Sequence, residues 1–433
     1  MQAYIDAISA HLDPVRAELR AGTYSDLRDG EGHQYVDLVQ EGGGMLGIAL
    51  LGYTHVLEEC GLRFWSLGGT SAGAINTMAL AGLGRRHEAK SLRALQHLSA
   101  LDTSRFTDGH PKVTQTIQYA LANGLGLNTA TLKHFVDFDI SRFFDGFQLS
   151  DIVHGAWIEA YKKMGLNPGN AFTLWMTSIL ASAQISELGQ LQERFDEVPE
   201  GMTLANGSTF DPSKFPRKLK LVAAELTTQS KVIFPEHAPL FWANSHQLPP
   251  AILVRASMSI PFFFEPLHLA QLPTSSLEEW KKLGYKGSQA PTEALFVDGG
   301  VISNFPINLF HSPGVPEFPT FGVKLGFDRV ETKKIKSPPE MLSTIFEQAK
   351  NSLDDDFLMQ NPDYEKLVKC IDTGAHDWLN FAMTTEAKVD LFRRGALAAI
   401  DFLKGFDWKA YKDVREKLAA IPVSSPPKQP ISK

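Results

Sequence analysis

The chain has 433 residues, of which 43% are hydrophobic and 21% charged, a composition that supports a sizeable folded core and excludes wholesale disorder. Its formal net charge is −7 and it has no cluster of lysine and arginine, which argues against nucleic acid as a partner and against a general attraction to anionic lipid headgroups. Two cysteines, Cys60 and Cys370, are too few for a disulfide framework or a metal site, and we expect both to be buried thiols.

The first 20 residues predict an amphipathic helix. Its apolar face collects Tyr4, Ile5, Ile8, Leu12, Val15 and Leu19. We expect this face to pack on the domain, because a single moderate apolar stripe more often covers a core than a membrane. The segment does not have the basic start and unbroken apolar run of a secretory signal, and no segment is long enough to cross a bilayer. We therefore expect a cytoplasmic protein with at most peripheral membrane contact.

Two strand–turn–helix units follow in succession. In the first, the strand QYVDLVQ (34–40) leads through a glycine-rich turn into a helical segment over 48–61. In the second, the strand RFWSLGG (63–69) runs into the small and apolar residues of a buried helix over 70–84. Such units predict parallel strands with crossover helices, and therefore an α/β layered fold.

The remainder of the chain predicts an interrupted sheet. Helices and polar loops are expected in an insertion, and strand character then returns in three segments, 218–234, 251–264 and 293–300. The expected division is an N-terminal helical segment (1–35), a catalytic domain (36–310) with a helical insertion (about 87–215), a mostly helical C-terminal extension (311–420) and a disordered Pro- and Ser-rich tail (421–433).

The glycines of the first turn raise the question of which anion they hold. Gly42, Gly44 and Gly47 form the pattern G-x-G-x-x-G, which in dinucleotide-binding folds is followed by an acidic residue at the end of the second strand. Here that position holds Gly69-Thr70-Ser71-Ala72-Gly73, which fits G-x-S-x-G. In that motif the serine sits at a sharp strand-to-helix turn, and flanking glycines avoid collisions with neighbouring backbone. We expect Ser71 to be presented to substrate and not buried.

Together the two turns predict one acyl-transfer site. Amide groups at the start of the helix, with those of Gly43 and Gly44 in the glycine turn, can stabilise negative charge on a reacting carbonyl oxygen. A serine hydroxyl also needs a base. Asp298 ends an apolar strand and is followed by Gly299 and Gly300, so we expect its carboxylate at the strand-end edge where Ser71 lies.

The glycine loop GGGMLG, the elbow GTSAG and the DGG at 298–300, in that order, resemble the patatin family of lipid acyl hydrolases. VAAELTTQSKVIF, VRASMSIPFFFEP and CIDTGAHDWLNFAMTTEAKVDLFRRGALAA are similar to further stretches of that family. The resemblance covers roughly 36–86 and 217–400 and implies a three-layer α/β/α fold with a mainly parallel central sheet and a helical insertion.

The resemblance also implies a mechanism. Ser71 would be the nucleophile and Asp298 its general base, in a dyad without histidine. Gly42, Gly43 and Gly44 would form the oxyanion hole, and the substrate would be a phospholipid or another acyl lipid, with no cofactor or metal. One position departs from the family: Leu46 stands where many members have Arg or Lys, so any help from that cation is absent.

Two other functions fit parts of the pattern. An esterase with a Ser-Asp-His triad would need a histidine after the acid, and His311 and His376 are the candidates. A nucleotide-binding or oligomerising regulatory protein would leave Ser71 idle and bind NAD or a similar ligand.

The remaining signals favour structural roles. Phe262, Phe263 and Phe264 fit an acyl-chain pocket or a buried strand equally well. A local helical core is the better explanation than a lid or membrane patch for five insertion aromatics, Phe135, Phe138, Phe143, Phe144 and Phe147. The acidic run at 354–356 predicts a solvated surface, because three adjacent acids point in different directions and make a poor calcium site.

Overall fold

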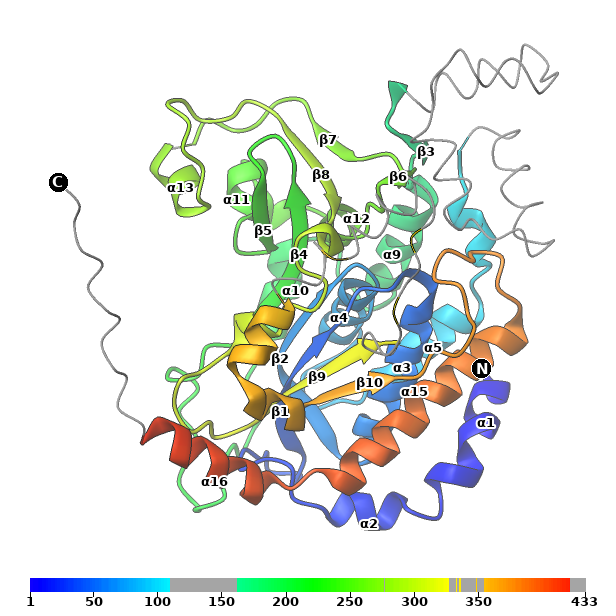
Figure 1. Ribbon diagram of the computed structural model, residues 1–433, viewed down its shortest axis with the longest axis vertical. Helices are drawn as coiled ribbons and strands as arrows, with labels where there is room; N and C mark the ends of the chain where they lie inside the picture. Colours follow the sequence, from blue (N-terminus) through cyan, green and yellow to red (C-terminus); the bar gives the residue numbers. More distant parts are fainter. Residues whose placement is uncertain are drawn as a thin grey trace.

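One mixed, mainly parallel sheet of eight strands organises the protein, and helices flank it (Figure 1). The computed structural model describes residues 1–109, 162–275, 277–326 and 354–420, together with positions 332, 335 and 348. The main path through the sheet follows the strand order β10 (Val368–Ile371), β9 (Thr320–Leu325), β1 (Gln34–Gln40), β2 (Leu62–Thr70), β4 (Leu219–Glu225), β8 (Ala294–Asp298) and β7 (Leu267–Leu269), with β5 (Ser230–Phe234) paired to β4.

The parallel and antiparallel parts of this sheet meet at β4. The strands from β10 to β4 are parallel to their neighbours, whereas β5 and β8 run antiparallel to β4. Every residue of β1 and β2 is buried, as expected for parallel strands that are covered on both faces. The predicted α/β architecture with a mainly parallel sheet is therefore confirmed.

Helices follow each of the first two strands, and a C-terminal helix packs against the first of these helices. The helix α3 (Ile48–Glu59) follows β1, and α4 (Ala72–Gly82) follows β2. Next to α3 lies α15 (Thr385–Gly405), and their backbones almost touch, because a Cβ atom at Gly52 would lie 1.9 Å from the carbonyl oxygen of Phe392. In a second, smaller core, Tyr35 of β1 and Trp65 of β2 pack with Phe210 and Met202.

The N-terminal segment packs on the domain, as predicted. It forms two helices, α1 (Gln2–Leu12) and α2 (Arg16–Ala21), because Pro14 interrupts the periodic pattern. The helix α1 runs beside α15 (Figure 1), and the ring of Tyr4 meets that of Phe392 edge-on at 5.5 Å.

The region between α4 and β4 contains α5 (Ser91–Ser99), η2 (Thr103–Phe106), β3 (Gly165–Asn167), α9 (Asn170–Ser182) and α10 (Leu188–Asp196). The five insertion aromatics named above and the expected tail at 421–433 lie outside the described residues. After β8 come η4 (Gly299–Val301), η5 (Ile307–Phe310), β9, η6 (Pro362–Lys366), β10, α15 and α16 (Trp408–Ala419). The C-terminal segment thus adds two strands to the sheet as well as helices, and the domain boundaries stay a prediction.

The strand expected over 251–264 is wrong for its first half. The segment forms the helix α12 (Ala251–Ser257), and only Phe262–Phe264 form a short strand, β6, which pairs with β3. Pro249 and Pro250 precede the helix, and proline favours the start of a helix because its fixed φ is preorganised there. The elements α11 (Ala238–Phe241), η3 (Ser245–Gln247) and α13 (Leu277–Lys282) complete this part of the fold. The ring of Phe263 stacks on Phe381 at 4.6 Å, so at least this aromatic belongs to the core.

The two cysteines differ in burial. Cys60 is a buried thiol as expected, whereas Cys370 is only partly buried, so the expectation of a buried thiol is wrong for Cys370. Cys370 lies on β10, which among the described strands is at an edge of the main sheet and pairs with β9.

Candidate active site

Ser71 occupies a strained turn between β2 and α4. Its backbone has φ +52° and ψ −117°, a conformation that L-residues rarely adopt and that is commonly maintained at functional sites. The turn is possible only with small neighbours, since a Cβ atom at Gly73 would lie 2.2 Å from the carbonyl oxygen of Gln40. The residue is 4% exposed, so the expectation that Ser71 is not buried is wrong. Contacts from the glycine loop and the Asp298 turn enclose it.

Ser71 and Asp298 are in direct contact. The Ser71 hydroxyl donates a hydrogen bond to Oδ2 of Asp298 at 2.5 Å. The other carboxylate oxygen, Oδ1, accepts the N–H of Gly300 at 2.7 Å, and the Asp298 N–H donates to the carbonyl oxygen of Ser259 at 2.8 Å. Asp298 is 7% exposed, so this short bond between a hydroxyl and a carboxylate lies in a largely dry environment.

The two strands reach this contact from opposite directions, which differs from the expected shared edge. β2 is parallel to β4 and its last residue, Thr70, is registered with Val222. β8 is antiparallel to β4 and its last residue, Asp298, is registered with Ala223. The ends of β2 and β8 therefore converge over adjacent residues in the middle of β4.

The glycine loop lies directly against the serine turn. A Cβ atom at Gly42 would lie 3.1 Å from Cβ of Ser71, and one at Gly47 would lie 2.7 Å from Cβ of Ala72. Gly44 has φ +53°, in the left-handed region that favours glycine. Among the described residues, the N–H groups of Gly43 and Gly44 donate to no acceptor. This arrangement offers two backbone donors next to a serine hydroxyl that is hydrogen-bonded to a carboxylate.

Neither candidate histidine contacts this pair. His311 shares a hydrogen bond with the Tyr364 hydroxyl at 2.9 Å, and burial with the nearby Arg415 lowers its pKa. His376 pairs through Nε2 with Asp390 at 2.9 Å. The geometry therefore gives no support to a Ser-Asp-His triad.

Comparison with known proteins identifies the family. The family model described as patatin-like phospholipase matches residues 38–311, which is more than half of the chain. The chain belongs to the patatin-like phospholipase family. Membership implies acyl hydrolase activity and suggests a serine hydrolase, and the mixed sheet with flanking helices agrees with the patatin fold.

Two individual proteins are also similar to this chain. The uncharacterized protein YqhO of Bacillus subtilis (strain 168) is 28% identical over 372 residues, which is 86% of this chain and 98% of that protein. The crystal structure of VipD from Legionella pneumophila matches with 15% identity and a TM-score of 0.38, and the match covers 90% of this chain and 72% of that one.

One short segment, which the sequence suggested to be a strand, contacts both Ser71 and Asp298. The hydroxyl of Ser257, at the end of α12, accepts the Ser71 N–H at 3.0 Å and donates to the Val222 carbonyl at 2.6 Å. Two residues further along, the Ser259 carbonyl accepts the Asp298 N–H. The segment was recognised only through its resemblance to the family, because nothing in its composition indicates such contacts.

The turn after Asp298 is anchored by a residue that was expected on the surface. Asp354 is 5% exposed and accepts hydrogen bonds from the Ser303 hydroxyl at 2.8 Å and the Phe305 N–H at 2.7 Å. Burial raises the pKa of this carboxyl group. The solvated acidic run predicted at 354–356 is therefore wrong for Asp354. The Ser303 carbonyl in turn accepts the hydroxyl of Thr70, the residue before Ser71.

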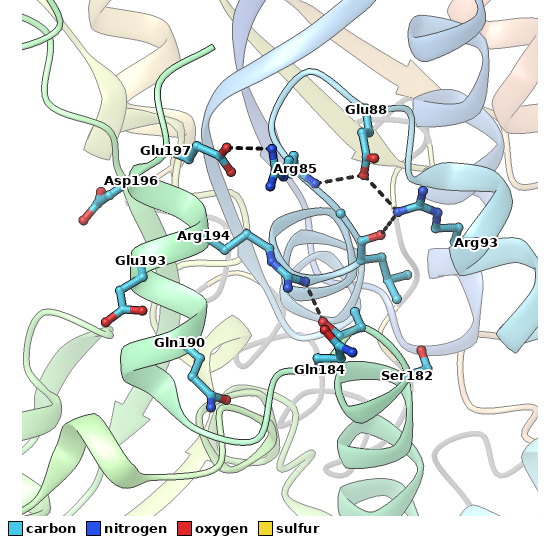
Figure 2. Close-up of a pocket in the computed structure, with 13 residues that line it drawn as sticks. Arg85, Glu88, Arg93, Ser182, Gln184, Gln190, Glu193, Arg194, Asp196 and Glu197 are labelled. Atoms are coloured by element: carbon cyan, nitrogen blue, oxygen red, sulfur yellow. Dashed lines mark hydrogen bonds and ion pairs between the residues drawn. The ribbon is translucent and has the colours of Figure 1, made fainter. Parts of the chain in front are cut away.

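A cavity of about 900 Å³ (Figure 2) has neither Ser71 nor Asp298 among the residues that line it. Ser71 precedes the first residue of α4, whereas this cavity lies beyond the last, about 16 Å further along the helix at 1.5 Å per residue. Its arginines are already engaged: Arg194 donates to the carbonyl oxygens of Gly82 and Ala183 at the ends of α4 and α9, and Arg93 donates to that of Leu83. Figure 2 shows Arg85 directed toward Glu197. The cavity therefore reflects capped helix ends and not an acyl-chain site.

No helix in the described ranges combines the length and the apolar character that crossing a membrane requires.

Proposed function

We propose that the protein hydrolyses carboxylic esters of phospholipids or related acyl lipids, with Ser71 as the nucleophile and Asp298 as the general base. The observation that carries the proposal is the 2.5 Å hydrogen bond from the Ser71 hydroxyl to the Asp298 carboxylate, at a strained turn beside two backbone N–H groups that have no acceptor among the described residues. These are the three parts that acyl transfer needs: a nucleophile, a base within bonding distance, and donors for the developing oxyanion.

The reaction follows from these positions. Asp298 takes the hydroxyl proton as Ser71 Oγ attacks the ester carbonyl, and the N–H groups of the glycine loop, chiefly those of Gly43 and Gly44, stabilise the tetrahedral oxyanion. Collapse of this intermediate expels the lysolipid alkoxide, which receives the proton from Asp298, and leaves the acyl group on Ser71. Asp298 then deprotonates a water molecule that attacks the acyl-enzyme, and the fatty acid leaves.

A carboxylate can act here without histidine because its surroundings favour proton transfer. Oδ2 of Asp298 lies within hydrogen-bond distance of the hydroxyl at a site with little exposure to water, and the Gly300 N–H holds the second oxygen and so aims Oδ2 at the hydroxyl. Leu46 brings no cation to the loop, so in this proposal oxyanion stabilisation comes from backbone donors alone.

The test compares wild type with two variants. Ser71→Ala and Asp298→Asn should each lower hydrolysis of a short-chain nitrophenyl ester at least about 1,000-fold, since loss of a covalent nucleophile or its base removes most of the rate enhancement. Lipid mass spectrometry of a phospholipid mixture should show lysolipid and free fatty acid only with wild type. Asp372→Asn, which changes an exposed carboxylate, is the matched control and should retain activity. Activity in Ser71→Ala equal to wild type would overturn the proposal, and binding of NAD without any reaction of Ser71 with a fluorophosphonate would favour a regulatory protein.

A further inference from the structure

Asn304 holds the glycine loop at both ends of one residue, Gly42. Its backbone carbonyl accepts the Gly42 N–H at 3.0 Å, and its side-chain Nδ2 donates to the Gly42 carbonyl at 3.1 Å. Asn304 is 4% exposed and lies six positions after Asp298, in the turn that carries the proposed base. The same residue therefore contacts the oxyanion loop and belongs to the Asp298 turn.

The hydrogen bond to the Gly42 carbonyl fixes more than that oxygen. The Gly42 carbonyl and the Gly43 N–H belong to one planar peptide group, which is trans because the cis bond in the described residues is Phe234–Pro235. In a trans peptide the carbonyl and the N–H point in opposite directions. Holding the carbonyl toward Asn304 therefore directs the Gly43 N–H away from Asn304.

Glycine on both sides makes this peptide easy to rotate. Gly42, Gly43 and Gly44 are consecutive, and glycine accepts backbone conformations on both sides of φ 0° without steric cost. A rotated Gly42–Gly43 peptide would present its carbonyl oxygen where the N–H is needed, and that oxygen would repel a developing oxyanion. Something other than local sterics has to keep the N–H in place.

Glu41 fixes the orientation of the Asn304 amide. Its Oε1 accepts Asn304 Nδ2 at 2.9 Å, and its Oε2 accepts the N–H of Leu325 on β9 at 2.6 Å. A carboxylate only accepts, so it selects the amide orientation in which the NH₂ group faces both Glu41 and the Gly42 carbonyl. Glu41 itself is 6% exposed and tied to the sheet by its own N–H, which donates to Val323.

We propose that Asn304, oriented by Glu41, is a positioning residue that keeps the Gly43 N–H directed into the oxyanion hole. The proposal rests on the proposed function, and it adds a specific requirement: the donor at the Asn304 side chain is needed for turnover although it does not touch the substrate.

The Asn304→Asp variant tests this requirement, because it keeps the shape and removes the donor. At pH 8 the new carboxylate at position 304 faces two acceptors, the Glu41 carboxylate and the Gly42 carbonyl. We therefore expect the Gly42–Gly43 peptide to rotate, so that the Gly43 N–H donates a hydrogen bond to this carboxylate. We expect kcat for a nitrophenyl ester to fall by about 100-fold, in the range seen when one oxyanion donor is lost, with KM changed less than about threefold.

The pH dependence separates positioning from a general loss of structure. The Glu41 charge raises the pKa of a second carboxyl group placed beside it, so the variant should regain a protonated donor at mildly acidic pH. The ratio of variant to wild-type kcat should therefore rise at least about fivefold between pH 8 and pH 5.5. Asn167→Asp is the matched control: Asn167 is also a buried amide, its Nδ2 donates to the Phe263 carbonyl at 2.9 Å, and its variant should show no such rise.

Crystal structures of Asn304→Asp at pH 8 and pH 5.5 give a readout that does not depend on activity. The expected result is a rotated Gly42–Gly43 peptide at pH 8 and the wild-type orientation at pH 5.5. An unrotated peptide at pH 8, or a variant with wild-type kcat, would overturn the proposal. A rotated peptide together with a wild type that hydrolyses no ester would leave the positioning role in place and reject the proposed function. Where Asn304→Asp does not fold at pH 8, Asn304→Ala is the second variant, and it should lose kcat similarly without recovery at pH 5.5; full activity in Asn304→Ala would contradict the role.

Discussion

The Ser71 hydroxyl donates directly to the Asp298 carboxylate, and in the described part of the chain no histidine lies between them. A direct serine–carboxylate pair requires the carboxylate to perform the proton transfers that histidine performs in a triad. From this contact we expect replacement of Asp298 to abolish activity and replacement of the candidate histidines to leave it intact.

Replacement of the two candidate histidines should leave catalysis intact. We expect His311→Ala and His376→Ala to retain nitrophenyl ester hydrolysis within about threefold of wild type, because neither ring contacts the dyad and each has its own partner, Tyr364 or Asp390. The measurement is kcat/KM after correction for folded protein by circular dichroism. A loss in either variant as deep as that in Ser71→Ala would restore the triad as the better mechanism.

Loss of the Ser257 hydroxyl should impair both stability and turnover. Ser257→Ala leaves the Ser71 N–H without its acceptor and the Val222 carbonyl without its donor, and unpaired buried polar groups cost about 1–3 kcal/mol each. We expect a reduced free energy of unfolding in urea and a fall in kcat of about 10-fold as the serine turn loosens. Ser230→Ala removes another buried serine hydroxyl outside the site and should keep wild-type kcat. Equal kcat in the two variants would show that the Ser71 turn does not depend on Ser257.

The glycine loop should not tolerate a side chain at Gly44. This residue has φ +53°, and a Cβ atom would lie 2.3 Å from the carbonyl oxygen of Trp378, which accepts the neighbouring Met45 N–H. We expect Gly44→Ala to lower kcat about 100-fold, the cost of a displaced oxyanion donor. Gly207→Ala is the matched control, because Gly207 has φ +79° but nothing within 4 Å of the Cβ position. In both variants an alanine is forced to a positive φ, which costs about 1 kcal/mol. A similar loss of kcat in both would therefore show that this backbone strain, and not the contact with Trp378, causes the effect.

Asp37 should make the protein less stable as pH rises. Burial raises the pKa of its carboxyl group to about 6, and Oδ1 has no hydrogen-bond partner in the described structure. Because the folded-state pKa lies above the unfolded value of about 4, the stabilising protonated form is fully present below pH 4 and its contribution is lost as pH rises through 6. A shift of about two units corresponds to roughly 3 kcal/mol.

Asp37→Asn removes this loss and should raise the free energy of unfolding at pH 8 by up to about 3 kcal/mol, with little gain at pH 4. Urea denaturation at the two pH values measures the difference. Asp413→Asn, at an exposed position, should change stability by less than about 0.5 kcal/mol at either pH. A gain at pH 4 as large as that at pH 8 would mean that packing, and not titration of Asp37, explains the effect.

Several features of the fold follow from local patterns and were predictable. The apolar run at 34–40 and the alternation of strand, glycine turn and helix identify β1, α3, β2 and α4, because these patterns act within a few residues of one another. The glycines around Ser71 indicate a tight turn for the same local reason. The helix at 251–257 was mistaken for a strand because a short apolar run does not distinguish the two.

Burial was harder to predict for polar residues. Asp354 lies in an acidic run that usually faces water, yet it accepts two hydrogen bonds in the interior. Ser71 was expected to be presented and is 4% exposed. In both cases the partners come from segments remote in the chain, and no local pattern encodes them.

By itself, the sequence determined which residues carry the candidate chemistry, since a serine between glycines, a glycine loop and an Asp-Gly-Gly turn each have a local steric reason to exist. Only the tertiary structure decided how they meet. β8 is antiparallel to β4, so Asp298 approaches Ser71 from the direction opposite to that of β2. In the turn that follows Asp298, the side chain of Asn304 donates a hydrogen bond to the Gly42 carbonyl. The direction of β8 depends on its pairing with β4, where Ala223 is registered with Asp298, 75 positions further along the chain. The contacts of Ser71 with Asp298 and of Asn304 with Gly42 join residues 227 and 262 positions apart, and such pairing is a property of the whole packed sheet.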